Sequence, residues 1–265
     1  MSEFRQGCTS PAIDLWLLST DFETTTQQVL KACLSPAEQA QLQRIRRPAV
    51  QGKFLASRGC LRHLLSRYTG QAPAALTFVY GPKGKPELSP ATSSAGAMPK
   101  FNLSHSGQRL LVAISTAADV RAIGVDIEAL RPVTCLPGLC RRYLTAAEAE
   151  TVLALPHPQA DHHFLRYWTG KEACLKSLGI GIADSMQALE LRLEVPLTSG
   201  PTSVKVATAP GLDHPGQLYQ WYQPGYMGAI AVQAALLEPE RLRFWQTTPA
   251  ALLADCSPTG PQLSR

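Results

Sequence analysis

The feature that most limits the fold of this chain is an internal repeat with a spacing of 110 residues. A helix start is predicted at Ser35–Glu38, because the serine can cap the helix and the glutamate three residues later can bond back to the cap. The same pattern returns at Thr145–Glu148, and Phe54-Leu55 returns at the same offset as Phe164-Leu165. Matches at one constant offset indicate two copies of one supersecondary unit.

Each copy is predicted to combine helices with strands. In the first copy, hydrophobic patterns predict a helix over 52–68 and strands at 13–18, 76–80, 101–103 and 110–114. In the second copy they predict a long helix beginning at Phe164-Leu165 and strands at 123–127, 189–195, 219–221 and 227–232. We therefore predict an α+β fold of two similar half-domains related by a pseudo-two-fold axis, with the active site in the cleft between them.

The repeat also predicts where the chain divides. We expect an N-terminal half-domain over residues 1–118 and a C-terminal half-domain over 119–240, joined by a short connection between the two copies. Residues 241–265 have no counterpart in the repeat. They are therefore expected to form a C-terminal appendage that is partly disordered.

Charge and cysteine content limit the classes of function. The net charge of +5 is spread along the chain, which suits an anionic ligand without requiring one. No base-reading motif accompanies this charge, so nucleic acid is not an expected partner. The seven cysteines show neither a C-x-x-C pair nor zinc spacing, and no stretch resembles a signal peptide or a membrane span. We expect a protein of the reducing cytoplasm that does not act at a membrane.

Two carboxylates stand in the predicted strand Gly124–Glu128. The two-residue period of a strand places Asp126 and Glu128 on one face and the apolar residues on the other. A hard cation such as Mg²⁺ would relieve their repulsion, since it binds one or two protein carboxylates together with substrate phosphates. The alternative is a structural ion pair at the strand end, with Arg131 or Arg121 as the partner.

Another carboxylate lies in the predicted long helix. Glu172 and Lys176 are four residues apart and therefore neighbours on one helix face. They could supply a third metal ligand and a phosphate-binding cation, or they could form an ordinary exposed ion pair. The pattern alone leaves both interpretations open.

A polar turn follows the predicted strand 101–103. Ser104, His105 and Ser106 stand next to Gly107, and such a turn can present N–H groups and small donors to an anion. Gly84–Pro86 by itself indicates only a loop. Basic residues around the first predicted long helix could form a phosphate-binding face or a solvated helix face. They are Arg44, Arg46, Arg47, Lys53, Arg58 and Arg62.

Taken together, these segments resemble the 4′-phosphopantetheinyl transferases of the surfactin-synthetase-activating type. The resemblance spans roughly residues 13–232 and rests on motifs that occur in the family's order: Gly84–Pro86, Phe101–Ser106, Gly124–Glu128 and Trp168–Lys176. It implies transfer of the phosphopantetheine arm of coenzyme A to a serine hydroxyl of apo acyl or peptidyl carrier proteins, with release of adenosine 3′,5′-bisphosphate. Such carriers serve fatty-acid, polyketide and nonribosomal peptide biosynthesis. A monomer is expected by analogy, because each half would supply what a smaller trimeric relative takes from its neighbour.

The resemblance also implies roles for single residues. Asp126, Glu128 and Glu172 would hold Mg²⁺, with Mn²⁺ as a substitute, and Lys176 would contact a phosphate. A base must accept the proton of the carrier serine during phosphoryl transfer. Glu172 is the first choice for this base, and His105 is the second.

Further residues would bind coenzyme A. Ser104 and His105 would meet its phosphates, including the 3′-phosphate, and Asn102 would shape their turn. Three residues of a rigid turn would lie along the adenine: Gly84, Lys85 and Pro86.

The sequence departs from the family pattern in the first half. Some relatives carry basic residues where this chain has Glu38 and Gln41. The 3′-phosphate is therefore expected to rest on Arg47, Lys53 or Arg58.

Two other functions are compatible with the same residues. Clustered carboxylates that bind Mg²⁺ also serve phosphodiesterases and nucleases, which would need no carrier protein. A carrier-binding module with a decayed site is the other alternative, although the intact carboxylates and Lys176 argue against it.

Overall fold

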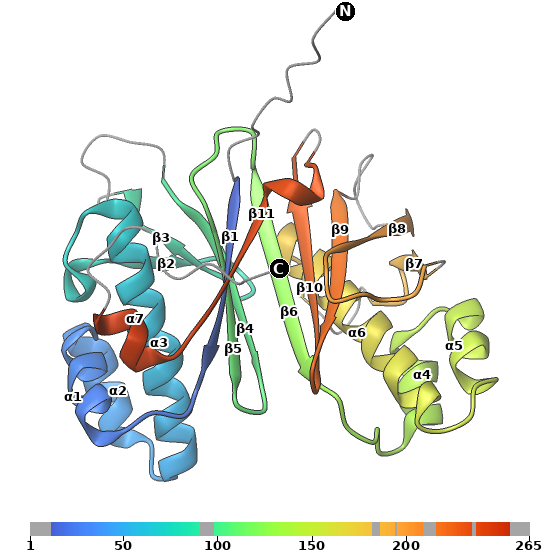
Figure 1. The fold of residues 1–265 in the computed structure, drawn as a ribbon, viewed down its shortest axis with the longest axis horizontal. Helices are drawn as coiled ribbons and strands as arrows, with labels where there is room; N and C mark the ends of the chain where they lie inside the picture. The colour runs from blue at the N-terminus through green and yellow to red at the C-terminus, as the bar shows by residue number, and fades with distance from the viewer. Residues whose placement is uncertain are drawn as a thin grey trace, which may run out of the picture.

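The computed structural model describes residues 12–90, 98–181, 186–193, 195–208, 216–234 and 237–254. Within these ranges the chain forms two α+β units that lie side by side, with the sheets at the centre and the helices on the outer flanks (Figure 1). No helix in the described ranges is long and apolar enough to cross a membrane. The architecture confirms the predicted α+β fold of two half-domains.

The N-terminal half contains one four-stranded sheet, a small hairpin and three helices. Its sheet has the order β11-β1-β5-β4, and the hairpin pairs β2 with β3. Its elements are β1 (Ile13–Ser19), α1 (Thr24–Ala32), α2 (Pro36–Arg44), α3 (Pro48–Thr69), η1 (Pro73–Ala75), β2 (Phe78–Tyr80), β3 (Pro86–Leu88), β4 (Lys100–Ser106) and β5 (Arg109–Ser115).

The C-terminal half repeats this plan with a five-stranded sheet of order β6-β10-β9-β8-β7. Its elements are β6 (Ala122–Ala129), α4 (Leu136–Tyr143), α5 (Ala146–Leu153), α6 (Gln159–Leu178), β7 (Glu190–Arg192), β8 (Thr202–Thr208), β9 (Gln217–Gln223) and β10 (Tyr226–Gln233). The chain continues through η3 (Pro239–Arg241), β11 (Leu242–Thr247) and α7 (Pro249–Ala254).

The repeat extends to a buried ion pair in each half. Both predicted capping boxes are present, at the starts of α2 and α5. The capping glutamate of each box also forms a salt bridge with a basic residue on the long helix of its half. Glu38 pairs with Arg62 on α3, and Glu148 pairs with Lys171 on α6. The two-half plan is thus kept in its buried charges as well as in its strands.

Some boundaries differ from those predicted. Helix α3 begins at Pro48 rather than at Gly52, because proline suits the first helical position. Helix α6 begins at Gln159, five residues before Phe164-Leu165, since apolar periodicity marks only the buried part of a helix. The strand predicted over 189–195 is limited to β7.

A third core joins the halves. The central strands β1, β5, β6 and β10 are buried on both faces, so one face packs under the helices of its own half and the other packs against the opposite sheet. The residues of the shared core include Leu15, Leu17, Leu111, Val125, Ile127, Ile230 and Val232. This core fixes β4 and β6 next to each other along the seam between the halves.

The C-terminal segment crosses back to the N-terminal half. Strand β11 pairs in parallel with β1, and the rings of Trp245 and Trp16 stack with centroids 5.0 Å apart. Figure 1 shows β11 running from the C-terminal sheet towards α7, which lies beside α1 and α3. Strand β11 therefore completes the N-terminal sheet and α7 packs against its helices, where an appendage over residues 241–265 was predicted. Residues 255–265 lie outside the described ranges, and the division near residue 118 stays a prediction.

Candidate active site

The site begins where β6 passes close to α6. A Cβ atom at Gly124 would lie 2.0 Å from the carbonyl oxygen of Ala173 and 2.3 Å from the amide nitrogen of Ser177. No side chain fits there, so glycine is what allows the strand backbone to touch the helix backbone. The contact brings the carboxylates of β6 to the polar residues of α6.

Asp126 lies at the centre of this contact and is 4 % exposed. Its Oδ1 accepts hydrogen bonds from Ser104 Oγ at 2.6 Å and from Lys176 Nζ at 2.7 Å. Burial raises the pKa of Asp126, and the charge of Lys176 and the hydroxyl of Ser104 oppose that shift. Its Oδ2 is buried and has no hydrogen-bond partner within the described part of the chain. A buried carboxylate oxygen without a donor is costly, so it is a natural ligand atom for a cation.

Glu128 lies two residues further along the same face of β6. Its Oε2 accepts a hydrogen bond from Ser106 Oγ at 2.8 Å, and the Nη2 of Arg131 lies 3.6 Å away. Burial raises the pKa of Glu128, and the charge of Asp126 adds to that shift. The alternative of an ion pair with Arg131 is therefore partly realised. The Arg131 side chain is more than half exposed, so this pair contributes little stability.

Glu172 supplies the third carboxylate. Burial raises the pKa of Glu172 to about 7; the charge of Lys176 opposes this shift, and the charges of Asp126 and Glu128 add to it. The three carboxylates are thus close enough to act on one another. Glu172 is also an i,i+4 partner of Lys176, with 3.7 Å between Oε2 and Nζ.

The ammonium of Lys176 lies among these carboxylates. Besides Asp126, it donates to Ser104 Oγ and to the carbonyl oxygen of Val125, both at 3.2 Å. Within the described ranges, no three carboxylate, imidazole or thiol groups are already gathered as a metal-ligand set. The atoms that could bind a metal are nevertheless all carboxylate oxygens, and Oδ2 of Asp126 has no partner among the described residues. Such oxygen ligands suit a hard cation such as Mg²⁺.

Strand β4 presents its even-numbered residues to this cluster. Ser104 and Ser106 reach the carboxylates of β6, and the Oδ1 of Asn102 accepts the backbone N–H of Val125 at 2.9 Å. Ser106 was not among the predicted site residues, although the two-residue period of the strand places it on the same face as Ser104. His105 is exposed, and this period puts it on the opposite face of β4, away from the carboxylates.

The turn at Gly84–Pro86 joins β2 to β3. Gly84 has a φ of 79°, a left-handed conformation that glycine adopts without strain. The Nζ of Lys85 donates to the carbonyl oxygens of Ile123 at 3.0 Å and Lys176 at 2.8 Å. The structure thus brings this turn to the site through the backbone of β6 and α6.

The predicted 3′-phosphate ligands lie at the start and along the side of α3. Arg47 is its N-cap residue and is exposed, as is Lys53. Arg58 is half-buried, and its Nη1 is buried without a hydrogen-bond partner among the described residues. Glu38, the acidic departure from the family pattern, is engaged by Arg62.

Comparison with known proteins identifies the family. The family model described as the 4′-phosphopantetheinyl transferase superfamily matches residues 122–213, and the model described as 4′-phosphopantetheinyl transferase, N-terminal, matches residues 22–117. The chain is 38 % identical over 202 residues to the 4′-phosphopantetheinyl transferase HetI of Nostoc sp.. The matched region covers 76 % of this chain and 80 % of the relative. The chain belongs to the 4′-phosphopantetheinyl transferase superfamily.

Two further relatives agree with this assignment. A putative 4′-phosphopantetheinyl transferase of Synechocystis sp. is 35 % identical over 176 residues, which is 66 % of this chain and 68 % of the relative. The 4′-phosphopantetheinyl transferase of Bacillus subtilis is 28 % identical over 134 residues, 51 % of this chain and 55 % of the relative.

Membership decides between the functions that the sequence left open. A 4′-phosphopantetheinyl transferase transfers the 4′-phosphopantetheine arm of coenzyme A to a serine hydroxyl of a carrier protein and releases adenosine 3′,5′-bisphosphate. The chain is therefore a transferase, not a phosphodiesterase or a nuclease.

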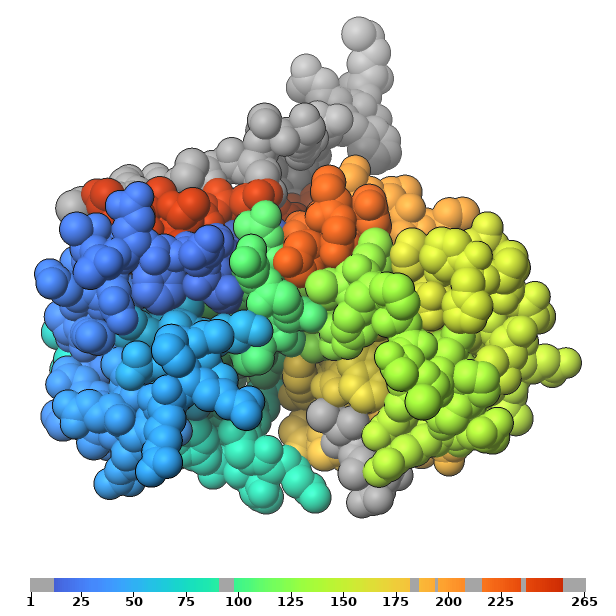
Figure 2. All heavy atoms as spheres, turned by 90° about the horizontal axis from the view of Figure 1, so that it is seen from below, coloured from blue at the N-terminus to red at the C-terminus, as the bar shows by residue number. Residues whose placement is uncertain are grey.

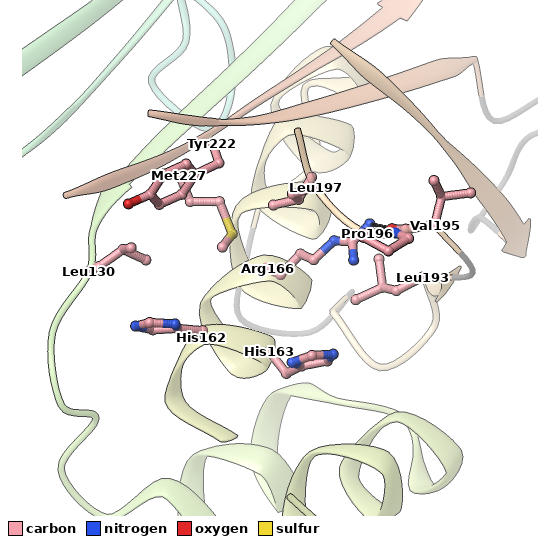
Figure 3. Close-up of a pocket in the computed structure, with 10 residues that line it drawn as sticks. All are labelled: Leu130, His162, His163, Arg166, Leu193, Val195, Pro196, Leu197, Tyr222 and Met227. Atoms are coloured by element: carbon pink, nitrogen blue, oxygen red, sulfur yellow. Dashed lines mark hydrogen bonds between the residues drawn. The ribbon is translucent and has the colours of Figure 1, made fainter. Parts of the chain in front are cut away.

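A cavity of about 400 Å³ lies in the C-terminal half, beside the first half of α6. Met227 lines it and is the ladder neighbour of Glu128. Figure 3 shows His162, His163 and Arg166 of α6 on one side of the cavity and Leu193, Val195, Pro196 and Leu197 on another. Arg166 holds this segment in place, since its Nη2 donates to the carbonyl oxygen of Val195 at 2.6 Å.

Proposed function

We propose that the transfer takes place at the seam between β4, β6 and α6 and depends on Mg²⁺. One observation carries this proposal: the buried Oδ2 of Asp126, which has no partner among the described residues, lies in a group of three carboxylates in which Asp126 raises the pKa of Glu128, and both raise the pKa of Glu172. A divalent cation would relieve this repulsion. Asp126, Glu128 and Glu172 would hold Mg²⁺, and Mn²⁺ would be an acceptable substitute.

The residues around the carboxylates would then bind and orient coenzyme A. Lys176, whose ammonium lies beside the carboxylates, is well placed to contact a phosphate. Ser104 would donate to the phosphates, and the unpartnered Nη1 of Arg58 supports a place for the 3′-phosphate near α3. We keep Arg47, Lys53 and His105 as further candidates for that phosphate. Gly84–Pro86 would lie along the adenine.

The chemical step would be an in-line displacement at the β-phosphorus of coenzyme A. The carrier serine oxygen forms the new bond, and the bond to the bridging oxygen breaks, so that adenosine 3′,5′-bisphosphate leaves. The chemistry that a bound Mg²⁺ supplies is withdrawal of charge from the pyrophosphate. Glu172 would accept the serine proton, because its carboxylate lies beside the position proposed for the reacting phosphate. His105 is a weaker candidate, since the strand period turns it away from the cluster.

The finer identity of the protein is also a proposal. We infer a monomeric, cytoplasmic enzyme of the surfactin-synthetase-activating type that acts on acyl or peptidyl carrier proteins of fatty-acid, polyketide or nonribosomal peptide biosynthesis. The exposed cations Arg141 and Arg142 on α4 support docking of an acidic carrier.

The test is the mass gain of apo carrier proteins incubated with coenzyme A and Mg²⁺. We expect Asp126→Ala and Glu172→Ala to abolish the Mg²⁺-dependent gain, whereas Glu150→Ala, which removes an exposed carboxylate on α5, should retain it. Full activity in both site variants, or undiminished activity of the wild type after chelation of divalent metal, would overturn the proposal.

A further inference from the structure

Lys85 makes a contact between the two halves that its expected role at the adenine does not explain. It lies in the β2–β3 turn of the N-terminal half, but both carbonyls that accept from its Nζ belong to the C-terminal half. One is Ile123 in β6, and the other is Lys176 itself. In Figure 2 the teal segment that contains this turn lies next to the yellow segment of α6.

The acceptor on α6 is in its last turn. Helix α6 ends at Leu178, and Gly179 caps it in the left-handed conformation with a φ of 69°. The carbonyl of Lys176 receives the Gly179 N–H at a long 3.3 Å and the Lys85 ammonium at 2.8 Å. A cation is favourable at a helix C-terminus, and a charged donor bonds a carbonyl more strongly than a neutral one. Lys85 is therefore the stronger of these two partners of the Lys176 carbonyl.

The other acceptor ties the same ammonium to the strand that carries Asp126. The Nζ of Lys85 thus joins the backbone of β6 to the backbone of α6. Its acceptor on the strand is three residues before Asp126, and its acceptor on the helix belongs to Lys176 itself. The close passage at Gly124 lies between these points. The position of the Lys176 side chain depends on this spacing, because it must reach Ser104 and Asp126 across the gap.

We propose that Lys85 is a positioning residue for Lys176: it fixes the last turn of α6 against β6 and so directs the Lys176 ammonium into the carboxylate cluster. The inference rests on the proposed role of Lys176 in phosphate binding. Misplacing a phosphate-contacting group by about 1 Å can cost about 100-fold in rate. Loss of Lys85 should therefore act mainly on kcat, even though Lys85 does not touch the reacting atoms.

The decisive experiment is a double-mutant cycle on the full-length protein. We expect Lys85→Met to lower kcat about 10- to 100-fold with a smaller change in KM for coenzyme A. In a Lys176→Ala background the same substitution should change kcat less than threefold, because the residue that it positions is gone. Lys83→Met is the matched control, since Lys83 is exposed on the same turn, and it should remain within twofold of the wild type.

If Lys85 served only to hold the adenine, the opposite pattern would be expected. KM for coenzyme A would then rise while kcat stayed constant, and the loss would persist in the Lys176→Ala background; either result overturns the proposal. Lys85→Arg, which keeps a cation with several donors, should recover at least a third of the wild-type kcat. Amide hydrogen exchange without coenzyme A gives a readout that does not depend on activity. Exchange at Ser177–Gly179 should speed up at least fivefold in Lys85→Met, and unchanged exchange would contradict the inference.

Discussion

At the scale of single residues, Gly124 shows how the lack of a side chain can decide the geometry of a site. The backbone of β6 touches that of α6 only because nothing projects from this residue. The distance between Asp126 and Lys176 follows from that contact. A glycine before the carboxylates is therefore as necessary for the cluster as the charged groups themselves.

Gly124→Ala tests this conclusion. The new methyl group would overlap the Ala173 carbonyl, so the strand or the helix must shift. We expect the free energy of unfolding to fall by about 1–3 kcal/mol and the transferase activity to fall strongly. Urea unfolding and the carrier-modification assay measure both. Gly138→Ala is the control, since a Cβ there meets nothing within 4 Å and should leave stability unchanged or slightly raised. Equal behaviour of the two variants would show that the close passage is unimportant.

Lys171 precedes Glu172 in the sequence but has a different role. It is completely buried, pairs with Glu148 and donates to the carbonyl oxygen of Met186 at 2.9 Å. It therefore ties α5 and the segment after α6 to the helix that carries Glu172 and Lys176.

Removal of this cation should destabilise the fold. We expect Lys171→Met to lower the free energy of unfolding by about 3–5 kcal/mol, because Glu148 would remain buried without its cation. Adding Glu148→Gln should recover part of the loss, whereas Lys205→Met at an exposed position of β8 should change stability by less than about 0.5 kcal/mol. Denaturant titration distinguishes these outcomes, and a stable Lys171→Met protein would refute the structural role.

At the scale of elements, strand β11 supplies partners for the aspartate of the N-terminal half. Asp14 on β1 is the counterpart of Asp126, but its carboxylate is fully engaged by Tyr68, Arg243 and Trp245. Two of these partners come from β11. The equivalent position in the C-terminal half is bordered by β4, whose serines leave one carboxylate oxygen of Asp126 unpartnered among the described residues. Asp14, which lies beside β11, therefore has a structural role. Asp126, which lies beside β4, is part of a candidate site.

Strand β11 should accordingly be essential for stability. Trp245→Ala removes the stack on Trp16 and a donor to Asp14, and we expect a loss of about 3–5 kcal/mol in the free energy of unfolding. Gln246→Ala, at an exposed position of the same strand, should have little effect. If Trp245→Ala unfolded at the wild-type urea concentration, the segment would be dispensable after all.

At the scale of the whole molecule, the proposed ligand site needs residues from both halves. The carboxylates and Lys176 belong to the C-terminal half, whereas Ser104, Ser106 and Arg58 belong to the N-terminal half. A ligand that spans the seam should therefore stabilise the whole protein.

Coenzyme A with Mg²⁺ at about 100 times its Kd should raise the free energy of unfolding by about 2.7 kcal/mol. Asp126→Asn should lose most of this gain, and Glu150→Gln should keep it. Thermal unfolding with and without both ligands measures the effect. An equal shift in Asp126→Asn would mean that the ligand binds elsewhere.

Much of this architecture could be predicted from local patterns. The capping boxes at Ser35 and Thr145, the strand carrying Asp126 and Glu128, and the helix carrying Glu172 depend on residues within a few positions of each other. The short elements α1, α4 and β8 were not predicted, and β11 lies outside the repeat. Ser106 was predicted only as part of the polar turn, although the period of β4 places it beside Ser104 and so next to the carboxylates.

The sequence by itself determined the two-fold plan, the α+β class and the face on which each carboxylate lies, because helix and strand periods are local properties of the chain. Only the tertiary structure decided that Lys176 lies beside the carboxylates of β6, that Lys85 joins β6 to α6 and that β11 returns to β1. These contacts join residues 38 to 231 positions apart. Their geometry is set by the packing of the shared core, and no periodicity within either half encodes it.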